Sequence, residues 1–75
     1  MLYIINASPY CIDVYIDDIK QYDNLPAGYS LTLRGVPQGT HEFFAMECNG
    51  GIAIASWGPK TYEQKKFSVV NIRCE

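Results

Sequence analysis

The sequence carries little positive charge and no cluster of it. Its 75 residues include six Lys and Arg against eight Asp and Glu, which gives a net charge of −2. Only Lys65 and Lys66 are adjacent basic residues. Nucleic acids and anionic membrane surfaces are bound mainly by several neighbouring cations that neutralise phosphates together. We therefore expect neither a nucleic acid nor an anionic membrane surface as a partner.

Long apolar runs are also absent. No run approaches the roughly 18 residues of a membrane-spanning helix, so membrane insertion is not expected. The chain starts Met-Leu-Tyr-Ile-Ile-Asn, without the basic start, the long apolar region and the small-residue cleavage site of a signal peptide. As written, the chain is expected to be cytoplasmic. A domain trimmed from an exported precursor would look the same, and would be extracellular or on the cell surface.

His41 is the only histidine, and this scarcity limits the chemistry open to the chain. It is the one natural general base near neutral pH. A nucleophile such as Ser30, Ser56 or Cys48 could lie beside it in space. No catalytic motif surrounds these residues, however, and we expect no enzyme and no catalytic residues.

The three cysteines, Cys11, Cys48 and Cys74, are too far apart for the short Cys-x-x-Cys spacings of zinc sites. The acidic residues form no Asp-x-Asp-x-Asp-Gly calcium loop. We therefore expect no metal and no cofactor. Because the number of cysteines is odd, at least one of them has no disulfide partner in the chain. All three are expected to be small buried hydrophobic residues, with one disulfide or a reactive thiol as alternatives.

What the sequence does contain is a repeated strand signal. Ile12, Val14 and Ile16 alternate with polar or amphipathic residues, a period of two that is typical of a strand buried on one face. No segment has a helical stripe longer than one turn. These features predict one all-β domain over residues 1–75, a small antiparallel β-sandwich of six to seven short strands (immunoglobulin- or transthyretin-like) without substantial helix. The expected strands are residues 2–6, 12–17, 30–34, 40–48, 52–57 and 67–74, with a shorter extended piece at 19–22.

Turn-forming residues separate these strands. Proline has no N–H to donate to a strand ladder, and glycine accepts a positive φ at no steric cost. Asn49-Gly50-Gly51 is expected to form a hairpin turn, Gly58-Pro59 to end a strand, and residues 60–66 to form a loop or a single turn. The residues expected to shape the other turns are Pro9, Gly28, Pro37, Gly39 and His41.

The order of several short motifs resembles a bacterial family. They are Ala7-Ser8-Pro9, Ile12-Asp13-Val14-Tyr15-Ile16-Asp17, Asn24-Leu25, Gly28 and Val36-Pro37-Gln38-Gly39-Thr40-His41. Over residues 7–45 the chain thereby resembles the domain-of-unknown-function family numbered 4397, with PEGA-type surface modules as a close second match. Both resemblances imply a small β-sandwich, and the family supplies no catalytic residues. The chain differs from the family in three respects. Asp18 stands where the family usually has glycine, and residues 46–75 match no part of the family pattern. Family members are often exported, whereas this sequence begins without a recognisable signal peptide.

Aromatic residues are abundant, with six Tyr, three Phe and one Trp. If Phe43 faces the core, Phe44 and Met46 point the other way, as Tyr15 does on its own strand. Trp57 ends the expected partner strand. Exposed aromatic and Met side chains supply large contact areas at low entropic cost. We expect Tyr15, Phe44, Met46 and Trp57 to bind a partner; the alternative is that a loop or the terminal strand covers them.

These features predict a non-catalytic binding module that docks a protein partner, or itself as a homodimer, through a sheet face or an edge strand. One alternative is a carbohydrate- or cell-surface-binding module of an exported protein, with carbohydrate as its ligand. A second alternative is a small inhibitor protein, for example phage-encoded, that acts on a host enzyme.

Overall fold

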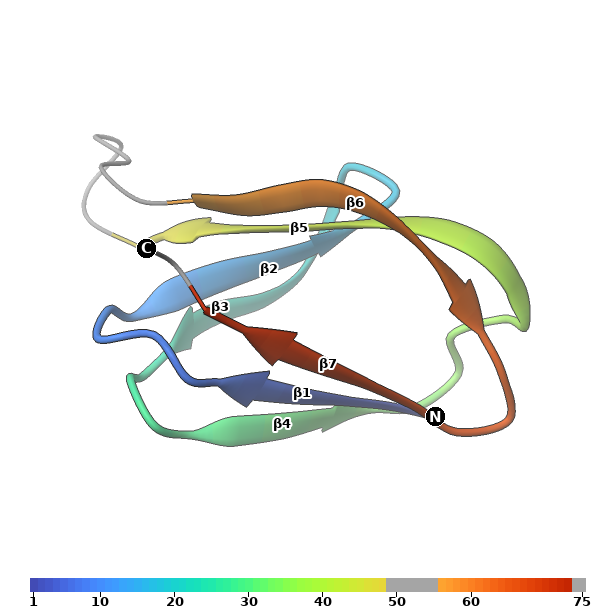
Figure 1. The fold of residues 1–75 in the computed structure, drawn as a ribbon, viewed down its shortest axis with the longest axis horizontal. Coiled ribbons are helices and arrows are strands. Elements are labelled where there is room, and N and C mark those ends of the chain that lie inside the picture. The colour runs from blue at the N-terminus through green and yellow to red at the C-terminus, as the bar shows by residue number, and fades with distance from the viewer. Residues whose placement is uncertain (49–55, 74–75) are drawn as a thin grey trace.

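The computed structural model describes residues 1–48 and 56–73, which form seven β-strands and no helix (Figure 1). The all-β expectation is therefore confirmed for these residues. None of them belongs to a helix that is long and apolar enough to cross a membrane. The strands are β1 (Leu2–Asn6), β2 (Ile12–Ile16), β3 (Ile19–Leu25), β4 (Ser30–Leu33), β5 (Gly39–Glu47), β6 (Ser56–Gln64) and β7 (Ser68–Ile72).

The strands form two sheets that face each other. One has the order β3-β2-β5-β6 and the other the order β4-β1-β7. All pairs are antiparallel except β1 and β7, which run parallel, and this corrects the expectation of a purely antiparallel sandwich. The reason lies in β6, which crosses from the four-stranded sheet towards the other one (Figure 1). After this crossover β7 enters beside β1 in the same direction, as parallel pairs require.

The core lies between the sheets, as the alternation of residues predicts. On β1 and β2 every second side chain is buried, and on β5 Phe43 and Ala45 point inward. Phe44 and Met46 are only partly buried, because neighbouring residues of a strand face opposite sides. The buried hydrophobic residues are Leu2, Ile4, Ile12, Val14, Ile16, Leu25, Phe43, Ala45, Val70 and Ile72.

β6 departs most from the sequence prediction. Gly58-Pro59 does not end a strand, and residues 60–64 are not a loop, because β6 continues through both. The chain stays paired with β5 by a bulge, in which Gly58 and Pro59 together lie opposite Phe44. Proline is tolerated at a bulge because no ladder hydrogen bond is lost there. The expected hairpin turn at 49–51 and residues 52–55 lie outside the described residues.

Gly58 makes this bulge possible. Its φ is +94°, and a Cβ atom at this position would lie 2.6 Å from the carbonyl oxygen of Phe43. Only glycine combines that backbone conformation with so close an approach. A glycine that the sequence suggests as a strand breaker is therefore the residue that lets the strand bend across the sandwich.

The turn between β2 and β3 has two residues, Asp17 and Asp18, with φ values of +51° and +65°. A two-residue hairpin turn with both φ values positive is the primed type, which matches the twist of the flanking strands. Asp18, where the resembling family has glycine, adopts this conformation because aspartate tolerates a positive φ better than most residues. β3 then extends to Leu25, beyond the expected end at residue 22.

Candidate functional site

The outer face of the four-stranded sheet brings together three of the four residues expected to bind a partner. Tyr15 on β2 lies directly opposite Phe44 on β5, and their ring centroids are 5.9 Å apart. Met46 lies opposite Asp13 on the same face. All three apolar residues are partly buried. We call Tyr15, Phe44 and Met46 the outer patch.

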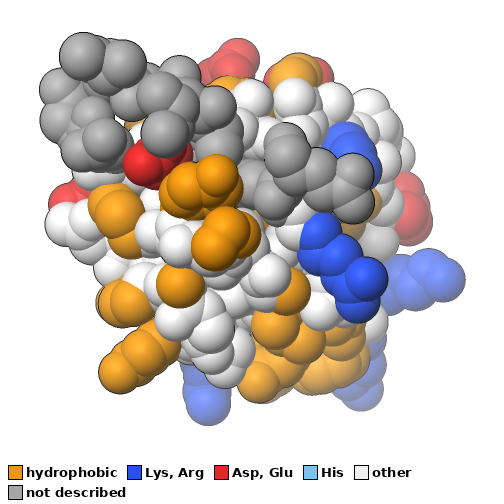
Figure 2. Space-filling view, turned by 60° about the vertical axis from the view of Figure 1, so that its left-hand side comes forward, with side chains coloured by type: hydrophobic (Ala, Val, Ile, Leu, Met, Phe, Trp, Pro, Cys, Tyr) orange, Lys and Arg blue, Asp and Glu red, His pale blue; other side chains and the backbone are white. Residues whose placement is uncertain are grey.

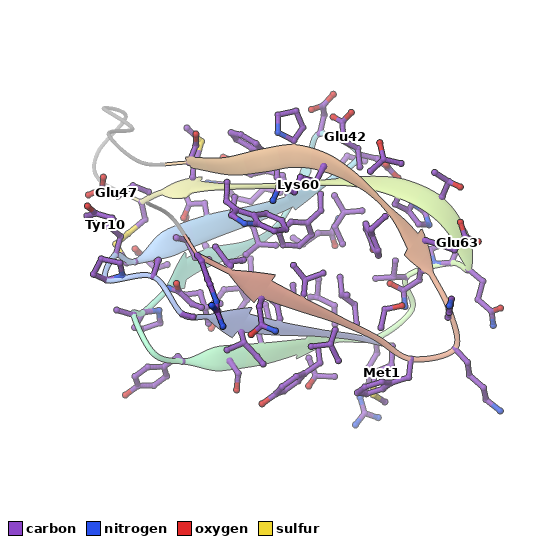
Figure 3. The ribbon with its side chains drawn as sticks, viewed as in Figure 1. Met1, Tyr10, Glu42, Glu47, Lys60 and Glu63 are labelled. Atoms are coloured by element: carbon purple, nitrogen blue, oxygen red, sulfur yellow. A yellow bond between two sulfur atoms is a disulfide. The ribbon has the colours of Figure 1, made fainter. Side chains whose placement is uncertain are left out.

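Trp57 does not belong to the outer patch. It lies opposite Ala45, on the inner face of the sheet, and packs against the core. Its ring meets Phe43 edge-on, with 5.3 Å between the centroids. The side chain of Lys60, labelled in Figure 3, makes a cation–π contact with Trp57, with 4.3 Å between its ammonium group and the centre of the ring. The pairing of Trp57 with Ala45 sets this orientation, and the sequence alone did not reveal this pairing.

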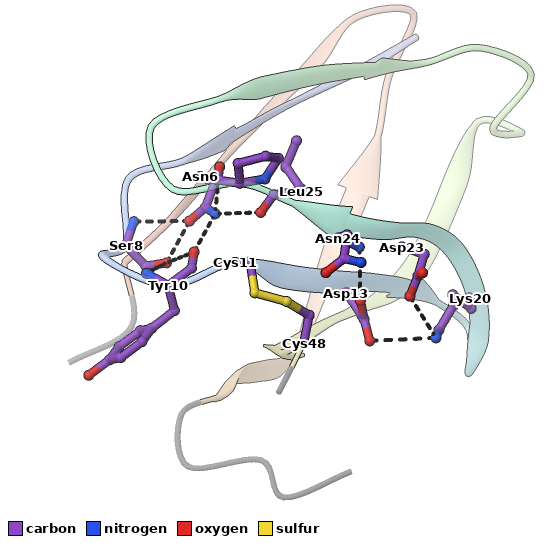
Figure 4. Close-up of a disulfide and its surroundings, with 11 residues drawn as sticks. Asn6, Ser8, Tyr10, Cys11, Asp13, Lys20, Asp23, Asn24, Leu25 and Cys48 are labelled. Atoms are coloured by element: carbon purple, nitrogen blue, oxygen red, sulfur yellow. Dashed lines mark hydrogen bonds and ion pairs between the residues drawn. A yellow bond between two sulfur atoms is a disulfide. The ribbon is translucent and has the colours of Figure 1, made fainter. Parts of the chain in front are cut away.

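Lys20 closes one side of the outer patch. Its ammonium group lies 3.5 Å from Asp13 and 3.2 Å from Asp23 (Figure 4). The same group lies 5.7 Å from the centre of the Tyr15 ring. The hydrogen bond to Asp23 raises the pKa of Lys20, so this cation keeps its proton. Asp13 also accepts a hydrogen bond from the backbone N–H of Asn24. The patch therefore has an apolar centre and a charged margin formed by Asp13 of β2 and by Lys20 and Asp23 of β3.

His41 and Asp17 form a pair at the end of the sandwich where β2 ends. Nδ1 of His41 lies 2.6 Å from the Asp17 carboxylate, and Nε2 lies 2.7 Å from the carbonyl oxygen of Pro37. Both ring nitrogens thus face acceptors, and only the protonated ring can donate to both. The Asp17 hydrogen bond, followed by the Pro37 carbonyl, raises the pKa of His41. The backbone N–H of Glu42, followed by His41, lowers the pKa of Asp17.

This arrangement ties the connection before β5 to the turn after β2. Among residues 1–48 and 56–73, the hydrogen-bond partners of the two His41 ring nitrogens are the Asp17 carboxylate and the Pro37 carbonyl, and neither is a hydroxyl or a thiol. Two of the candidate nucleophiles have other partners. The Ser30 hydroxyl oxygen accepts a hydrogen bond from the hydroxyl of Tyr3, and Cys48 forms a disulfide with Cys11.

The pair predicts a pH dependence of stability. Folding raises the pKa of His41 above 6.5, so its contribution is complete below pH 6.5 and is lost as the pH rises through the raised value. Folding lowers the pKa of Asp17 below 3.8, so its contribution is complete above pH 3.8 and is lost as the pH falls through the lowered value. The pair therefore stabilises the fold most between these two pH values.

We expect the melting temperature of the wild-type protein to fall relative to that of His41→Gln as the pH rises above 6.5. Calorimetric melting curves of both proteins between about pH 3 and about pH 9 measure this difference. Parallel curves over the whole range would show that His41 and Asp17 do not form a stabilising pair in solution.

Asn6 is a structural residue that the sequence reasoning missed. Its side chain is completely buried. Its amide nitrogen lies within hydrogen-bond distance of the carbonyl oxygens of Tyr10, Leu25 and Pro26, at 2.8, 3.0 and 3.1 Å (Figure 4). Its side-chain oxygen accepts from the N–H and the hydroxyl of Ser8. The available signal was an Asn at a strand end followed by Ser and Pro, a combination that favours side-chain-to-backbone bonding in turns.

Cys11 and Cys48 form a disulfide, with their Cα atoms 5.6 Å apart (Figure 4). It links the residue before β2 to the residue after β5, and the N–H of Cys48 donates to the carbonyl of Cys11 beside it. The expectation of buried thiols is therefore wrong for these two residues, and the alternative of one disulfide is correct. Cys74 lies outside the described residues. Three cysteines allow more than one pairing, so the sequence did not identify this one.

Within residues 1–48 and 56–73, no three His, Cys, Asp or Glu side chains are grouped so that they could hold a metal ion. A scan against protein-family models and searches of curated proteins and of solved structures found no match to this chain. The resemblance of residues 7–45 to the family numbered 4397 therefore stays a hypothesis that depends on the motifs quoted above.

Proposed function

We propose that this domain is a non-catalytic binding module that docks a protein partner through the outer face of the β3-β2-β5-β6 sheet. The simplest partner is a second copy of the chain. The observation that carries the proposal is the outer patch: Tyr15, Phe44 and Met46 are adjacent on a face that no other described strand covers.

The physical argument concerns β5. An antiparallel sheet with one solvated face should alternate apolar and polar residues, but residues 43–46 of β5 are Phe-Phe-Ala-Met. Phe43 and Ala45 are accounted for by the core, whereas Phe44 and Met46 are not. Hiding about 200 Å² of such surface would contribute about 5 kcal/mol before the costs of association. A two-fold dimer would cover the same patch on both copies.

The face is a better docking surface than the adjoining edge. β3 is exposed at six of its seven residues, but its register against β2 is irregular and it carries Lys20. Bulges and lysines on an edge strand disfavour the addition of another strand. The charged margin formed by Lys20, Asp13 and Asp23 would instead set the orientation of a partner seated on the patch.

Light scattering after size-exclusion chromatography tests this proposal. We expect wild-type protein at twice the chain mass of 8.5 kDa and Phe44→Glu at the chain mass, with unchanged circular dichroism. Thr32→Glu is the matched control, because Thr32 is exposed on β4 in the other sheet and receives the same charge. This control should remain a dimer.

Two results would contradict the proposal. A wild-type protein that is monomeric at high concentration would show that the chain does not self-associate. A Thr32→Glu variant that dissociates as Phe44→Glu does would show that any added negative charge breaks the dimer, whether or not it lies on the outer patch. If Phe44→Glu unfolds, Met46→Glu provides the second test. Unfolding of both variants would assign the outer patch to the core.

The disulfide favours a second candidate, a carbohydrate- or cell-surface-binding module of an exported protein. Disulfides persist mainly in oxidising compartments, so Cys11–Cys48 supports a location outside the cytoplasm. Figure 2 turns the left-hand side of Figure 1 towards the viewer. Hydrophobic side chains are spread over the face seen in this view. Tyr29, just before β4, is 65% exposed. A tyrosine so exposed offers a ring face and a hydroxyl to a polar ligand such as a sugar.

A further inference from the structure

A pocket of about 250 Å³ opens beside the two-residue turn between β2 and β3, at the opposite end of the sandwich from Cys11 and Cys48. It lies between this turn and the connection from β4 to β5. Its apolar lining comes from Ile16, Ile19, Val36 and Pro37. The pocket is separate from the outer patch, none of whose residues lines it. A ligand that fits it is small and partly apolar, because sites for drug-sized molecules begin at about 300 Å³.

The charged residues of the pocket are unequally occupied. Asp17 and His41 engage each other, and their remaining polar atoms contact the N–H of Glu42 and the carbonyl of Pro37. Arg34, which also lines the pocket, takes part in none of the ion pairs formed within residues 1–48 and 56–73. The charge in the pocket that is open to a ligand is therefore the guanidinium group of Arg34.

Gln21 adds a polar group to the same pocket. It lies at the irregularity in the β2–β3 pairing, where Lys20 pairs with Tyr15 and Tyr22 pairs with Val14. The residue between two such pairs has no partner across the strands, and a bulge of this kind re-aims a side chain. Gln21 lines the pocket as a result. One N–H of its amide donates to the carbonyl of Ile19 at 3.4 Å, and the second N–H can donate to an acceptor in the pocket.

We propose that this pocket binds a carboxylate attached to a compact apolar group. Guanidinium groups bind carboxylates through two parallel hydrogen bonds, which makes Arg34 the specific anchor. Gln21 supplies a further donor, and Ile19 and Val36 contact the apolar part of the ligand. Two sources share this chemistry: a free small carboxylic acid, and the apolar C-terminal residue of a peptide.

An NMR titration of the ¹⁵N-labelled full chain tests the proposal. The probes are isovalerate and its uncharged twin isovaleramide, and a short peptide ending in leucine with a free or an amidated C-terminus. We expect backbone signals of Ile19, Gln21 and Val36 to shift, with dissociation constants on the order of 1 mM for the acids. Each acid should bind about tenfold more tightly than its amide.

The variants separate the two parts of the ligand. Arg34→Gln should weaken binding of the acids about tenfold and leave the amides unchanged. Arg73→Gln is the matched control, since Arg73 is an exposed arginine that does not line the pocket, and it should change neither. Ile19→Ala should weaken acids and amides alike, at little cost in stability because Ile19 is 64% exposed.

The comparison of probes also identifies the source. Tighter binding of the peptide acid than of isovalerate supports a peptide C-terminus, and equal binding supports a free acid. Equal affinity of acids and amides, an equal loss in Arg34→Gln and Arg73→Gln, or no shift of the pocket signals up to about 20 mM probe would overturn the assignment. These outcomes are independent of Phe44→Glu, so the pocket and the outer patch can fail separately.

Discussion

Replacing Cys11 and Cys48 together by serine is expected to lower the free energy of unfolding by about 4 kcal/mol. The disulfide joins residues 37 positions apart, and a cross-link over a loop of this length removes much of the conformational entropy of the unfolded chain. Small domains have only about 5–15 kcal/mol of stability in total, so the variant should be close to unfolding at physiological temperature. Urea unfolding followed by tryptophan fluorescence, with Trp57 as the probe, measures the difference.

Reduction provides the matched control. A reducing agent should destabilise the wild-type protein by about as much as the double substitution does, and should leave the double variant unchanged. Thiol titration of the unfolded wild-type protein without reductant should find no more than one thiol per chain, against three after reduction. Three thiols before reduction, together with a double variant as stable as the wild type, would show that the disulfide does not form in solution.

Asn6→Ala is expected to lower the free energy of unfolding by about 3 kcal/mol, measured by the same urea experiment. The substitution removes the amide that donates to the carbonyls of Tyr10, Leu25 and Pro26. The Tyr10 carbonyl keeps the Ser8 hydroxyl as a donor, and the Pro26 carbonyl keeps the backbone N–H of Tyr29. The bond to the Leu25 carbonyl is the fully buried one of the three, and taking a donor away from a buried acceptor costs more free energy than the hydrogen bond itself contributes. The loops that follow β1 and β3 should separate first, since Asn6 holds them together.

Asn6→Asp separates hydrogen bonding from packing. Its side chain has the same shape as that of asparagine, but it has no N–H to donate and brings a charge next to three carbonyl oxygens. We expect it to be at least as unstable as Asn6→Ala. Asn71→Ala is the control, because Asn71 is exposed on β7, and it should stay within about 0.5 kcal/mol of the wild type. An Asn6→Asp variant of wild-type stability would show that the amide donors contribute nothing.

The alternation of residues was sufficient to predict much of the fold. A strand places successive side chains on opposite faces, so Ile12, Val14 and Ile16 had to share one face if any of them was buried. With Phe43 on the core face, as the family resemblance implies, the same rule placed Phe44 on the opposite face, and both positions agree with the structure. Three members of the expected binding surface thus came from strand alternation together with the choice of Phe43 as a core residue.

Features that depend on distant pairings were not predictable in this way. Trp57 faces inward because it pairs with Ala45 of β5, and no local pattern specifies that register. His41 meets Asp17 across 24 positions of sequence, only because β2 and β5 are neighbours in the sheet.

For β1, β2, β4 and β5, the sequence by itself determined which residues form the strand and which face is apolar, because these depend on backbone geometry and on exclusion from water. The tertiary structure decided the parallel pairing of β1 with β7, the union of Cys11 with Cys48 and the burial of Asn6. Each of these joins segments that no local periodicity relates. Their free energy comes from contacts that exist only once the two sheets have packed together.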